Sequence, residues 1–349
     1  MNYSKLLNDS LLLSTSYNGN KDENDEKTVS TKDENGNKKS KIETPLLSNV
    51  EVKDDDISQC TQFLVERKKA VMKNISLSQD HINFSILLHH PSIDSYITRK
   101  IMKQGTYEPE MEQFLSQSYE KHIAFLNKNA TNMTNSNHKL WAVDIGANIG
   151  FHALHMASLG ANVIAFEPAP DTYSLIDCSS KVFQRSHTKG SLTVTQAGAS
   201  NVTSEAYMYR HPKSPGMTTF GSNSLFPLEK LDNASSIPII TAKSVLEQVI
   251  NTQDIERLWM LKVDVEGMEL QAFKGLDLKT YPFRYLTFEF FPIMLRESGR
   301  IDPLELLFYI RDEMGYKCNI DDVVGVSSNE KRKWLEGIGS HINVYCERM

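Results

Sequence analysis

From about residue 139 onward, short apolar runs alternate with segments of helical spacing. Such runs are typical of strands that are buried on both faces of a parallel sheet, with helices in the segments between them. The alternation predicts an α/β fold in which a mostly parallel sheet is covered on both faces. The predicted strands centre on Val143, Val163, Thr193, Val263, Phe288, Cys318 and Val344.

The N-terminal part of the chain has a different pattern. Residues 1–58 are rich in Asn, Asp, Lys, Ser and Glu, and we predict a disordered tail because this composition buries too little apolar surface to offset ordering entropy. Residues 59–138 are predicted to form a cap before the sheet domain at 139–349. The expected elements of this part are a helix over 57–72, a strand over 81–89, helices over 92–103 and 108–126, and a polar linker over 127–139.

One stretch of the predicted sheet domain breaks the alternation. Between residues 206 and 238 the sequence holds a short strand-like run at 207–209, a turn at 211–216 and a loop at 221–225. Long loops in compact domains are usually functional or mobile. Because this one precedes the strand that bears Asp264, we expect it to cover part of a ligand site.

The first chemical signal is the run DIGANIG at Asp144–Gly150, which follows the first predicted strand of the sheet. Gly146 and Gly150 lack a Cβ, so the chain can turn sharply and a ligand can approach the backbone closely. The helix that follows points its free N–H groups and positive dipole end at the same place. Glu167, at the end of the next strand, is placed to accept hydrogen bonds from ribose hydroxyls. The pattern indicates a pocket for a nucleoside-bearing cofactor.

The details of this loop favour S-adenosylmethionine over a dinucleotide. The fingerprint G-x-G-x-x-G, counted from Gly146, needs glycine where the chain has Asn148 and Phe151. The glycine that lets a pyrophosphate sit close is therefore missing. S-adenosylmethionine has no phosphate; its ammonium suits Asp144, directly or through water, and its carboxylate suits the loop N–H groups. The alternative is a solvated acid beside an ordinary turn, and Glu167 argues against it.

A second group of charges lies in the segment LKVDVEGME at 261–269. Residues two apart share a face of a strand, so Lys262, Asp264 and Glu266 are predicted on one face. The next strand carries Glu289 near its end. Ionisable groups in a central strand are costly unless they are paired or lie at the carboxyl end, where open α/β sheets bind ligands. Lys262 is expected to neutralise one of the three carboxylates, and a purely structural ion pair is the alternative.

These motifs resemble those of the FkbM-type S-adenosylmethionine-dependent methyltransferases. The resemblance rests on VDIGANIG at 143–150, FEP at 166–168, LKVDVEGME at 261–269 and FEFF at 288–291, and it covers about residues 82–346. It implies a Rossmann-like class I methyltransferase sheet of seven strands, mostly parallel, with the last strand antiparallel. Members of this family are associated with O-methylation of hydroxyls on sugars and polyketides.

The resemblance also implies where the cofactor lies. Its methionyl end would contact the glycine loop, its ribose the end of the second strand and its adenine the end of the third. Asp264 and Glu266 would sit beside the departing methyl group. The residues expected to bind the cofactor are Asp144, Gly146, Asn148, Gly150, Glu167, Pro168, Gln196, Ala197 and Asp264.

Methyl transfer to a hydroxyl requires alignment of the reacting atoms and removal of the hydroxyl proton. The clustered acids can raise one another's pKa toward the working range. We predict Glu266 as the base, with Asp264 orienting substrate or cofactor and with Glu289 and Lys262 completing the catalytic set. His152 is a further candidate for the base, although a single histidine on a helix is more often a packing residue. The three acids could hold a hard cation, but nothing in their spacing requires one and no metal is predicted.

Composition narrows the partners and the compartment. The formal net charge is −6, and the short basic runs at 67–69 and 331–333 have no interleaved aromatic residues, so no nucleic-acid partner is predicted. The four cysteines form no C-x-x-C pair, which predicts free thiols in a reducing compartment. The sequence has no early apolar signal region and no membrane-spanning run, so a cytoplasmic location is expected.

The predicted function is S-adenosylmethionine-dependent O-methylation of a hydroxyl on a sugar-containing or small-molecule acceptor. The alternative is a binding or scaffold protein that keeps the fold without turnover, and the joint presence of Asp144, Glu167, Asp264 and Glu266 favours the enzyme. A nicotinamide oxidoreductase is disfavoured by Asn148 and Phe151. The identity of the acceptor (glycan, lipid, small metabolite or protein) and the oligomeric state have no signature in the sequence.

Overall fold

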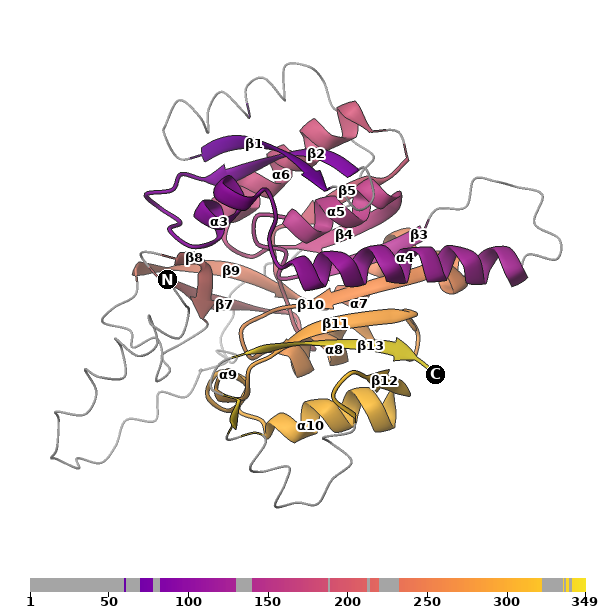
Figure 1. The fold of residues 1–349 in the computed structure, drawn as a ribbon. Coiled ribbons are helices and arrows are strands. Elements are labelled where there is room, and N and C mark those ends of the chain that lie inside the picture. The colour runs from indigo at the N-terminus through magenta and orange to yellow at the C-terminus, as the bar shows by residue number, and fades with distance from the viewer. Residues whose placement is uncertain are drawn as a thin grey trace, which may run out of the picture. The chain divides into compact units, whose positions relative to one another are not determined.

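Seven strands form the central sheet of the computed structural model (Figure 1). They are β3 (Leu140–Ile145), β4 (Ala161–Phe166), β5 (Ser191–Thr195), β10 (Leu258–Val263), β11 (Tyr285–Phe290), β12 (Tyr316–Cys318) and β13 (Ile342–Arg348). Their order in the sheet is β5–β4–β3–β10–β11–β13–β12, and β13 runs antiparallel to both of its neighbours while the other pairs are parallel. The predicted sheet of seven strands with an antiparallel last strand is confirmed.

The structure describes the greater part of the chain after residue 69. The described residues are 60, 70–77, 82–129, 140–187, 189–211, 214–219, 232–321, 335, 337, 338 and 341–349. The predicted tail at 1–58, the linker residues 130–139 and the predicted loop at 221–225 lie outside them.

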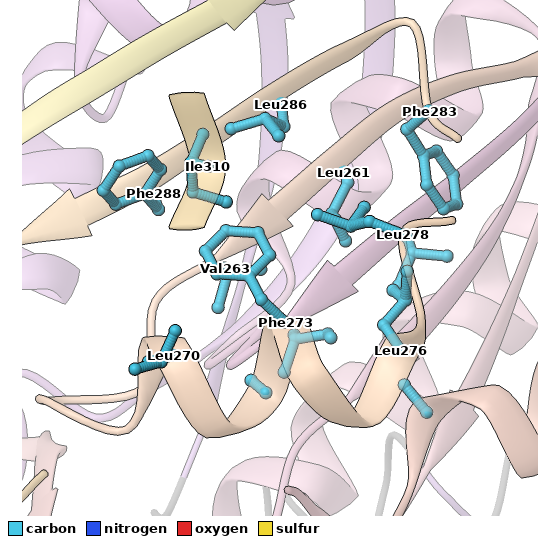
Figure 2. Close-up of a cluster of buried hydrophobic side chains, with 14 of the residues drawn as sticks. Leu261, Val263, Leu270, Phe273, Leu276, Leu278, Phe283, Leu286, Phe288 and Ile310 are labelled. Atoms are coloured by element: carbon cyan, nitrogen blue, oxygen red, sulfur yellow. The ribbon is translucent and has the colours of Figure 1, made fainter. Parts of the chain in front are cut away.

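Each central strand is apolar on both faces, as a covered parallel sheet requires. On β3, Ala142 belongs to one buried cluster, which we call the first cluster. Val143 and Ile145 belong to the second cluster, on the opposite face of the sheet. Figure 2 shows the second cluster, in which Phe273 packs against Leu261 and Val263 of β10 and against Phe288 of β11. The alternation along each strand therefore fixes which helices cover which face.

Two groups of helices supply these covers (Figure 1). The first cluster is covered by α4 (Pro109–Asn129), α5 (Phe151–Leu159) and α6 (Pro170–Ser186). The second is covered by α7 (Ala242–Val249), the 3₁₀ turn η2 (Thr252–Arg257), α8 (Glu269–Leu276), α9 (Pro292–Glu297), α10 (Pro303–Phe308) and the π turn η3 (Tyr309–Glu313). Among the described helices none is long and apolar enough to cross a bilayer.

The winding of the sheet determines where a ligand can bind. The chain proceeds from β3 through β4 to β5 in one direction along the sheet, and from β10 to β11 in the other. In open α/β sheets, ligands bind at the carboxyl edge where the direction reverses, which here lies between β3 and β10. Lys262 and Asp144 are paired in the register of these two strands, and the Asp264 N–H donates to the Ile145 carbonyl at 2.9 Å. The charged residues of both predicted motifs thus meet at this edge.

The N-terminal segment packs against the first helical cover. Its strands β1 (Ala70–Leu77) and β2 (Ile82–His89) form an antiparallel pair, and β2 lies over α5 and α6. The strand predicted at 81–89 is confirmed, but the helix predicted over 57–72 is wrong at its end because Ala70–Met72 belong to β1. Burial alternates through Asn74–Leu77 and suits a half-buried strand rather than a helix. The rest of that predicted helix, apart from Cys60, lies outside the described residues.

The two predicted helices of this segment are confirmed with shifted bounds. The first, α3 (Ile97–Gln104), begins later than the predicted residue 92. The Asp94 carboxylate accepts the N–H groups of Tyr96, Ile97 and Thr98 at 3.0, 3.1 and 2.8 Å, so the N–H groups that a helix start leaves unpaired are satisfied there. The second helix, α4, begins at Pro109 rather than at the predicted residue 108 and continues past the predicted residue 126 to Asn129, so the linker predicted from residue 127 is wrong for its first three residues.

The described part of the irregular stretch after β5 forms a small second sheet. Its strands are β6 (Gly198–Ala199), β7 (Ser204–His211), β8 (Ser214–Thr219) and β9 (Asp232–Ile240), in the order β6–β9–β7–β8. The register of β7 with β9 runs from Ser204–Ile239 to Arg210–Asp232. The polar residues of β9 are therefore paired through their backbone, and the polarity pattern of the sequence did not indicate a strand there. The short strand predicted at 207–209 is confirmed within β7, whereas the predicted turn at 211–216 is wrong for Ser214–Gly216, which belong to β8. That this stretch covers part of a ligand site stays a prediction.

All four cysteines are paired, which overturns the prediction of free thiols. Cys60 is bonded to Cys178 of α6, and Cys318 is bonded to Cys346. The second pair follows from the sheet, because Cys318 and Cys346 face each other in the β12–β13 register. Scattered positions in the sequence gave no sign of these contacts, since the fold brings together residues 118 and 28 positions apart. The compartment stays a prediction.

Candidate active site

The glycine loop takes the predicted sharp turn from β3 into α5. Gly146, Asn148 and Gly150 have φ of 81°, 52° and 82°, the left-handed region that favours glycine. A Cβ on Gly146 would lie 1.8 Å from the Asp264 carbonyl oxygen, and a Cβ on Gly150 would lie 2.5 Å from the side chain of Ile176. Glycine at both positions is therefore required by space as well as by conformation.

The N–H groups of this loop are largely used within the protein. Those of Gly146 and Ala147 donate to the Phe166 carbonyl at 3.0 Å, and that of Gly150 donates to the Ala147 carbonyl at 2.8 Å. The first N–H groups of a helix have no partner within it, so Phe151 and His152 in the first turn of α5 are the more suitable donors for an anionic group. The loop N–H groups were expected to bind a ligand carboxylate, and the structure leaves the first turn of α5 as the better place for it.

Glu167 holds the loop from the neighbouring strand end. Its two carboxylate oxygens accept the N–H groups of Asn148 and Ala169, each at 2.8 Å, and its side chain is almost fully buried. Burial raises its pKa to about 7, even though both N–H donors favour the ionised form. The structure thus brings Glu167 to the glycine loop as its spacing predicts, and its remaining lone pairs are the groups a ribose would use.

The other residues expected to contact the cofactor lie along the same edge. Pro168 follows Glu167 and is partly buried. Gln196 and Ala197 follow β5, whose Thr195 carbonyl accepts the N–H of Glu167 at 3.1 Å. The Ala197 side chain is buried in the second cluster, and its N–H donates to the Thr195 carbonyl at 3.0 Å.

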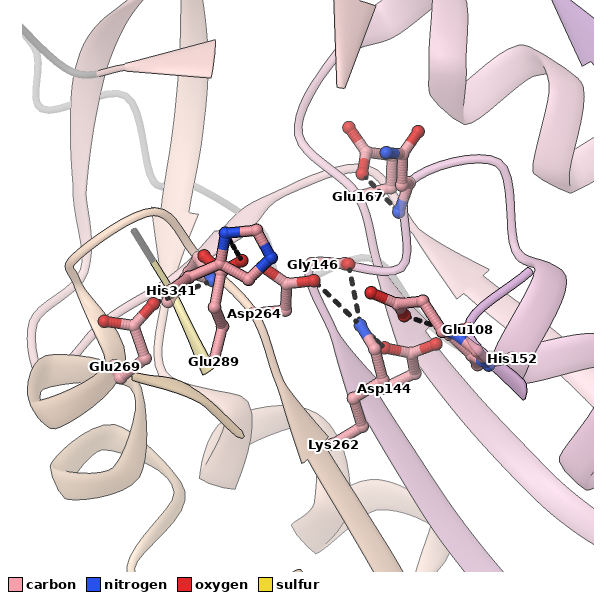
Figure 3. Close-up of polar contacts among 12 residues, drawn as sticks. Glu108, Asp144, Gly146, His152, Glu167, Lys262, Asp264, Glu269, Glu289 and His341 are labelled. Carbon is pink, nitrogen blue, oxygen red and sulfur yellow. Dashed lines mark hydrogen bonds and ion pairs between the residues drawn. The ribbon is translucent and has the colours of Figure 1, made fainter. Parts of the chain in front are cut away.

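A buried ion pair joins β10 to β3 (Figure 3). The Lys262 Nζ lies 3.2 Å from Asp144 Oδ1, 3.4 Å from the Gly146 carbonyl oxygen and 3.5 Å from Asp264 Oδ2. Burial disfavours the charged ammonium, but the carboxylates around it, Asp144 first, raise the pKa of Lys262 above its ordinary value. Asp144 has no exposed surface, and within the described residues its Oδ2 has no hydrogen-bond partner. Lys262 therefore pairs mainly with Asp144, which was not among the three acids it was expected to neutralise.

The second group of acids lies just beyond the ends of β10 and β11. Strand β10 ends at Val263, so the predicted alternation does not continue to Glu266, which turns the chain with φ of 53°. One carboxylate oxygen from each of Asp264, Glu266 and Glu289 lies within 4.8 Å of the others. Burial first, and then the neighbouring acids, raise the pKa of Glu266 and Glu289 well above the ordinary range. Burial also raises the pKa of Asp264, against the opposing charge of Lys262.

Oxygen atoms at this spacing could hold a hard cation, but acid clusters of this kind also occur without one. The absence of a metal stays a prediction for this site.

Glu269 supports this turn and was not predicted as a site residue. Its Oε1 accepts the N–H groups of Val265 and Gly267, both at 3.1 Å, and its side chain is buried. Burial raises its pKa to about 7. Gly267 has φ of 100°, and a Cβ there would lie 2.4 Å from the Met294 carbonyl oxygen. Gly267 and Glu269 of the segment EGME thus fix the backbone conformation of the turn that carries Glu266.

Two further side chains reach this edge from outside the motifs. Glu108, just before α4, places its Oε2 2.8 Å from Nε2 of His152 in α5. His341, just before β13, places its Nδ1 3.6 Å from Oε1 of Glu289. Because β13 is antiparallel to β11, its first residues lie where β11 ends, and this brings His341 to the acids. Neither Glu108 nor His341 belongs to a recognisable pattern, whereas His152 was a candidate from its place after the loop.

A cavity of about 270 Å³ lies away from these acids. It is at the opposite end of β11, beside Tyr285, and the bonded pair Cys318–Cys346 lines one side of it. Ligands of open α/β sheets bind at the carboxyl edge, so the acid-lined edge is the candidate site.

Comparison with known proteins agrees with this geometry. The FkbM methyltransferase domain matches residues 144–318, which is half of the chain. The chain belongs to the FkbM methyltransferase family. The matched segment begins at Asp144 and includes Glu289, so it contains both groups of predicted acids, whereas Glu108 and His341 lie outside it.

Curated relatives carry methyltransferase names. Methyltransferase 1 of Beauveria bassiana is 29% identical over 150 residues, covering 39% of this chain and 57% of that protein. The hexuronic acid methyltransferase AglP of Haloferax volcanii is 29% identical over 137 residues, covering 39% of this chain and 49% of that protein. The chain thus spans about half the length of these relatives. Among solved structures, a methyltransferase FkbM of Methylobacillus flagellatus has a TM-score of 0.34 and 15% identity, over 65% of this chain and 56% of that one.

Proposed function

We propose that this protein is an S-adenosylmethionine-dependent methyltransferase that methylates a hydroxyl on a sugar-containing or small-molecule acceptor. The family supports methyl transfer, and one relative is named for a hexuronic acid. The observation that carries the proposal is the excess of carboxylate groups around the glycine loop and the ends of β10 and β11.

When these acids are ionised, they favour a cationic cofactor, which lowers the cost of their charge. Lys262 is the permanent cation within this group, and His152 and His341 carry charge only when protonated. S-adenosylmethionine has two positive groups, a sulfonium and an ammonium, and one negative carboxylate, so its net positive charge compensates the acids. The pyrophosphate of a dinucleotide would be repelled by them. The carboxylates concerned are those of Glu108, Asp144, Glu167, Asp264, Glu266 and Glu289.

The donor set also suits the parts of this cofactor. The buried Asp144 with its unpaired Oδ2 and the glycine backbone would lie at the methionyl end, and Asn148 would complete that wall. Glu167 and Pro168 would hold the ribose, with Gln196 and Ala197 near the adenine. Asp264 would lie between the cofactor and the acceptor, since its side chain is more than one-third exposed and also faces Lys262.

When bound, S-adenosylmethionine would supply an activated methyl group, and the protein's own residues would align the acceptor and manage its proton. Glu266 is proposed as the base, because a carboxylate with a raised pKa holds a proton more readily than an ordinary one. Asp264 and Glu289 would orient the hydroxyl, and Lys262 would keep Asp144 and Asp264 in place. The acceptor proton would pass to the Glu266 carboxylate, so activity should rise with pH as Glu266 ionises.

The cofactor part of this proposal is tested by calorimetry on the full-length protein. S-adenosylmethionine and its demethylated product S-adenosylhomocysteine should bind, and NAD should give no heat. Binding of NAD without binding of S-adenosylmethionine would overturn the assignment.

The acceptor part needs a separate experiment. Methyl-labelled S-adenosylmethionine is offered with hydroxyl-rich acceptors, with uronic-acid sugars tested first. Label in an alkali-stable ether on the sugar is the expected result. Label that is released by mild alkali as an ester, or that is found on nitrogen, would overturn O-methylation of a hydroxyl.

A further inference from the structure

Glu108 occupies an unusual backbone position next to the candidate site. Its φ is 55°, a conformation that residues other than glycine, asparagine and aspartate seldom adopt. Such a strained position persists only where the surrounding structure holds it, and it is a reason to look for a function. The side chain extends from the start of α4 to His152, and Figure 3 shows its carboxylate beside Lys262 and Asp144.

The surroundings of the Glu108 carboxylate favour its ionised form. Burial raises its pKa, but the hydrogen bond from His152 and the charges of His152, Lys262 and His341 outweigh burial and lower the pKa to about 2. About a quarter of the side chain is exposed, so a ligand can reach it. Glu108 is thus an accessible anion at the edge of the glycine loop.

The motif acid Asp144 is less suited to meet a ligand. It has no exposed surface, and its Oδ1 is already paired with Lys262 at 3.2 Å. A cation that approaches from outside would have to displace Lys262 or open the strand ends to contact Asp144 directly. Of the carboxylates next to this ion pair, a ligand can reach those of Asp264 and Glu108 without such a change, and Glu108 is the one that is hydrogen-bonded to a residue in the first turn of α5.

The shape of the cofactor points to the same residue. In the methionyl group the ammonium and the carboxylate are attached to one carbon, so their binding partners must be close together. The unpaired N–H groups for the carboxylate are those of the first turn of α5, where His152 lies. Glu108 is hydrogen-bonded to the side chain of that histidine, so an anion for the ammonium is anchored to the same helical turn as the donors for the carboxylate.

We propose that Glu108 binds the ammonium group of the methionyl end of S-adenosylmethionine, so that the segment before the family domain completes the cofactor site. This inference rests on the proposed function. In it, His152 positions the Glu108 carboxylate, and Asp144 acts through Lys262 on the loop rather than on the cofactor itself.

The test is a double-mutant cycle measured by calorimetry with the full-length protein. The two ligands are S-adenosylhomocysteine and its analogue that lacks the amino group. The variants are Glu108→Gln, Glu108→Asn, which suits a positive φ, and Glu110→Gln, a control at an exposed position in the first turn of α4. Thermal melting checks that each variant is folded.

The expected result is a loss that depends on the amino group. Both Glu108 variants should bind S-adenosylhomocysteine about 10- to 100-fold more weakly than the wild type, as for a lost hydrogen bond between charged groups. They should bind the analogue within about twofold of the wild type, since the partner of Glu108 is already absent. Glu110→Gln should bind both ligands as the wild type does.

The other outcomes separate the two proposals. An equal loss for both ligands would show that Glu108 acts on the structure of the loop and would overturn the inference, as would unchanged affinity for S-adenosylhomocysteine. A wild-type protein that binds neither ligand would instead overturn the proposed function, whatever the variants do.

Discussion

The two halves of the candidate site hold their acids in different ways. In the β3–β4 half, Asp144 is paired with Lys262, and Glu167 accepts two backbone N–H groups. In the β10–β11 half, Glu266 and Glu289 lie against Asp264 and each other, and their pKa is raised well above the ordinary range. Acids of the first kind are held by a cation or by backbone N–H groups, whereas acids of the second kind lie buried against one another, an arrangement typical of groups that exchange protons in a reaction. We therefore expect binding to depend on the first half and turnover on the second.

The sharpest test of this division is Glu266→Gln. Turnover on an acceptor found by labelled transfer should fall by about 10²- to 10⁴-fold, the usual contribution of a general base. Affinity for S-adenosylmethionine, measured by calorimetry, should stay near that of the wild type, and Asp264→Asn should behave in the same direction. Glu313→Gln, at an exposed position, is the matched control. A Glu266→Gln protein with wild-type turnover would contradict the assignment.

Lys262→Met tests the β3–β4 half. The substitution leaves Asp144 buried without its cation, and breaking a buried pair in this way costs about 3–5 kcal/mol of unfolding free energy. Urea denaturation measures the loss.

Adding Asp144→Asn to Lys262→Met should restore part of the stability, because a neutral amide needs no cation. If Lys262→Met alone is as stable as the wild type, the ion pair does not hold the two strands as we describe.

Gly146→Ala tests whether the two halves depend on their close contact. Its Cβ would meet the Asp264 carbonyl at 1.8 Å and would adopt a positive φ, so we expect a loss of about 2–4 kcal/mol from overpacking and backbone strain together. Gly105→Ala is the control, because its φ is 71° and nothing lies within 4 Å of the added Cβ. It should lose only the backbone part, about 1 kcal/mol. If urea denaturation shows equal losses for the two variants, the loop does not make the close contact with the backbone of Asp264, just after β10.

The parts of the site that could be predicted from sequence are those that depend on local order. Asp144, Gly146 and Glu167 lie on one strand–loop–helix–strand unit, and Lys262 and Asp264 lie at the end of another, so periodicity and spacing were enough to bring them to one edge. The strands centred on Val143 and Val263 were predicted for the same reason, since continuous apolar runs report burial on both faces.

The parts that could not be predicted depend on contacts between distant segments. His341 reaches the acids because β13 pairs antiparallel with β11, and Glu108 reaches them because α4 packs across the first cluster. The pairing of Cys318 with Cys346 likewise follows from strand register. The strand β9 was missed because its polar residues carry no alternation, and its pairing with β7 comes from the backbone. Each of these contacts is absent from any local window of sequence.

The smallest expected effect concerns pH and again separates the halves. Burial raises the pKa of Glu167 from 4.5 to about 7, so between these values the folded protein holds a proton that the unfolded chain has lost. The contribution of Glu167 to stability is therefore present below about pH 4.5 and is lost as the pH rises to about 7. Buried neutral histidines act in the opposite direction, since burial lowers the pKa of His122 to about 4 and that of His155 to about 3.

The measurement must therefore be a difference between two proteins that share these histidines. Urea denaturation of the wild type and of Glu167→Gln, from pH 4.5 to 8, isolates the Glu167 contribution. The wild type should lose stability relative to the variant as the pH rises to about 7, and the difference should then stay constant. A difference that grows in favour of the wild type over this window would mean that the two N–H donors outweigh burial. In that case Glu167 would be an ionised carboxylate that only stabilises the loop. The difference in pKa between the acids of the two halves would then be larger than we infer.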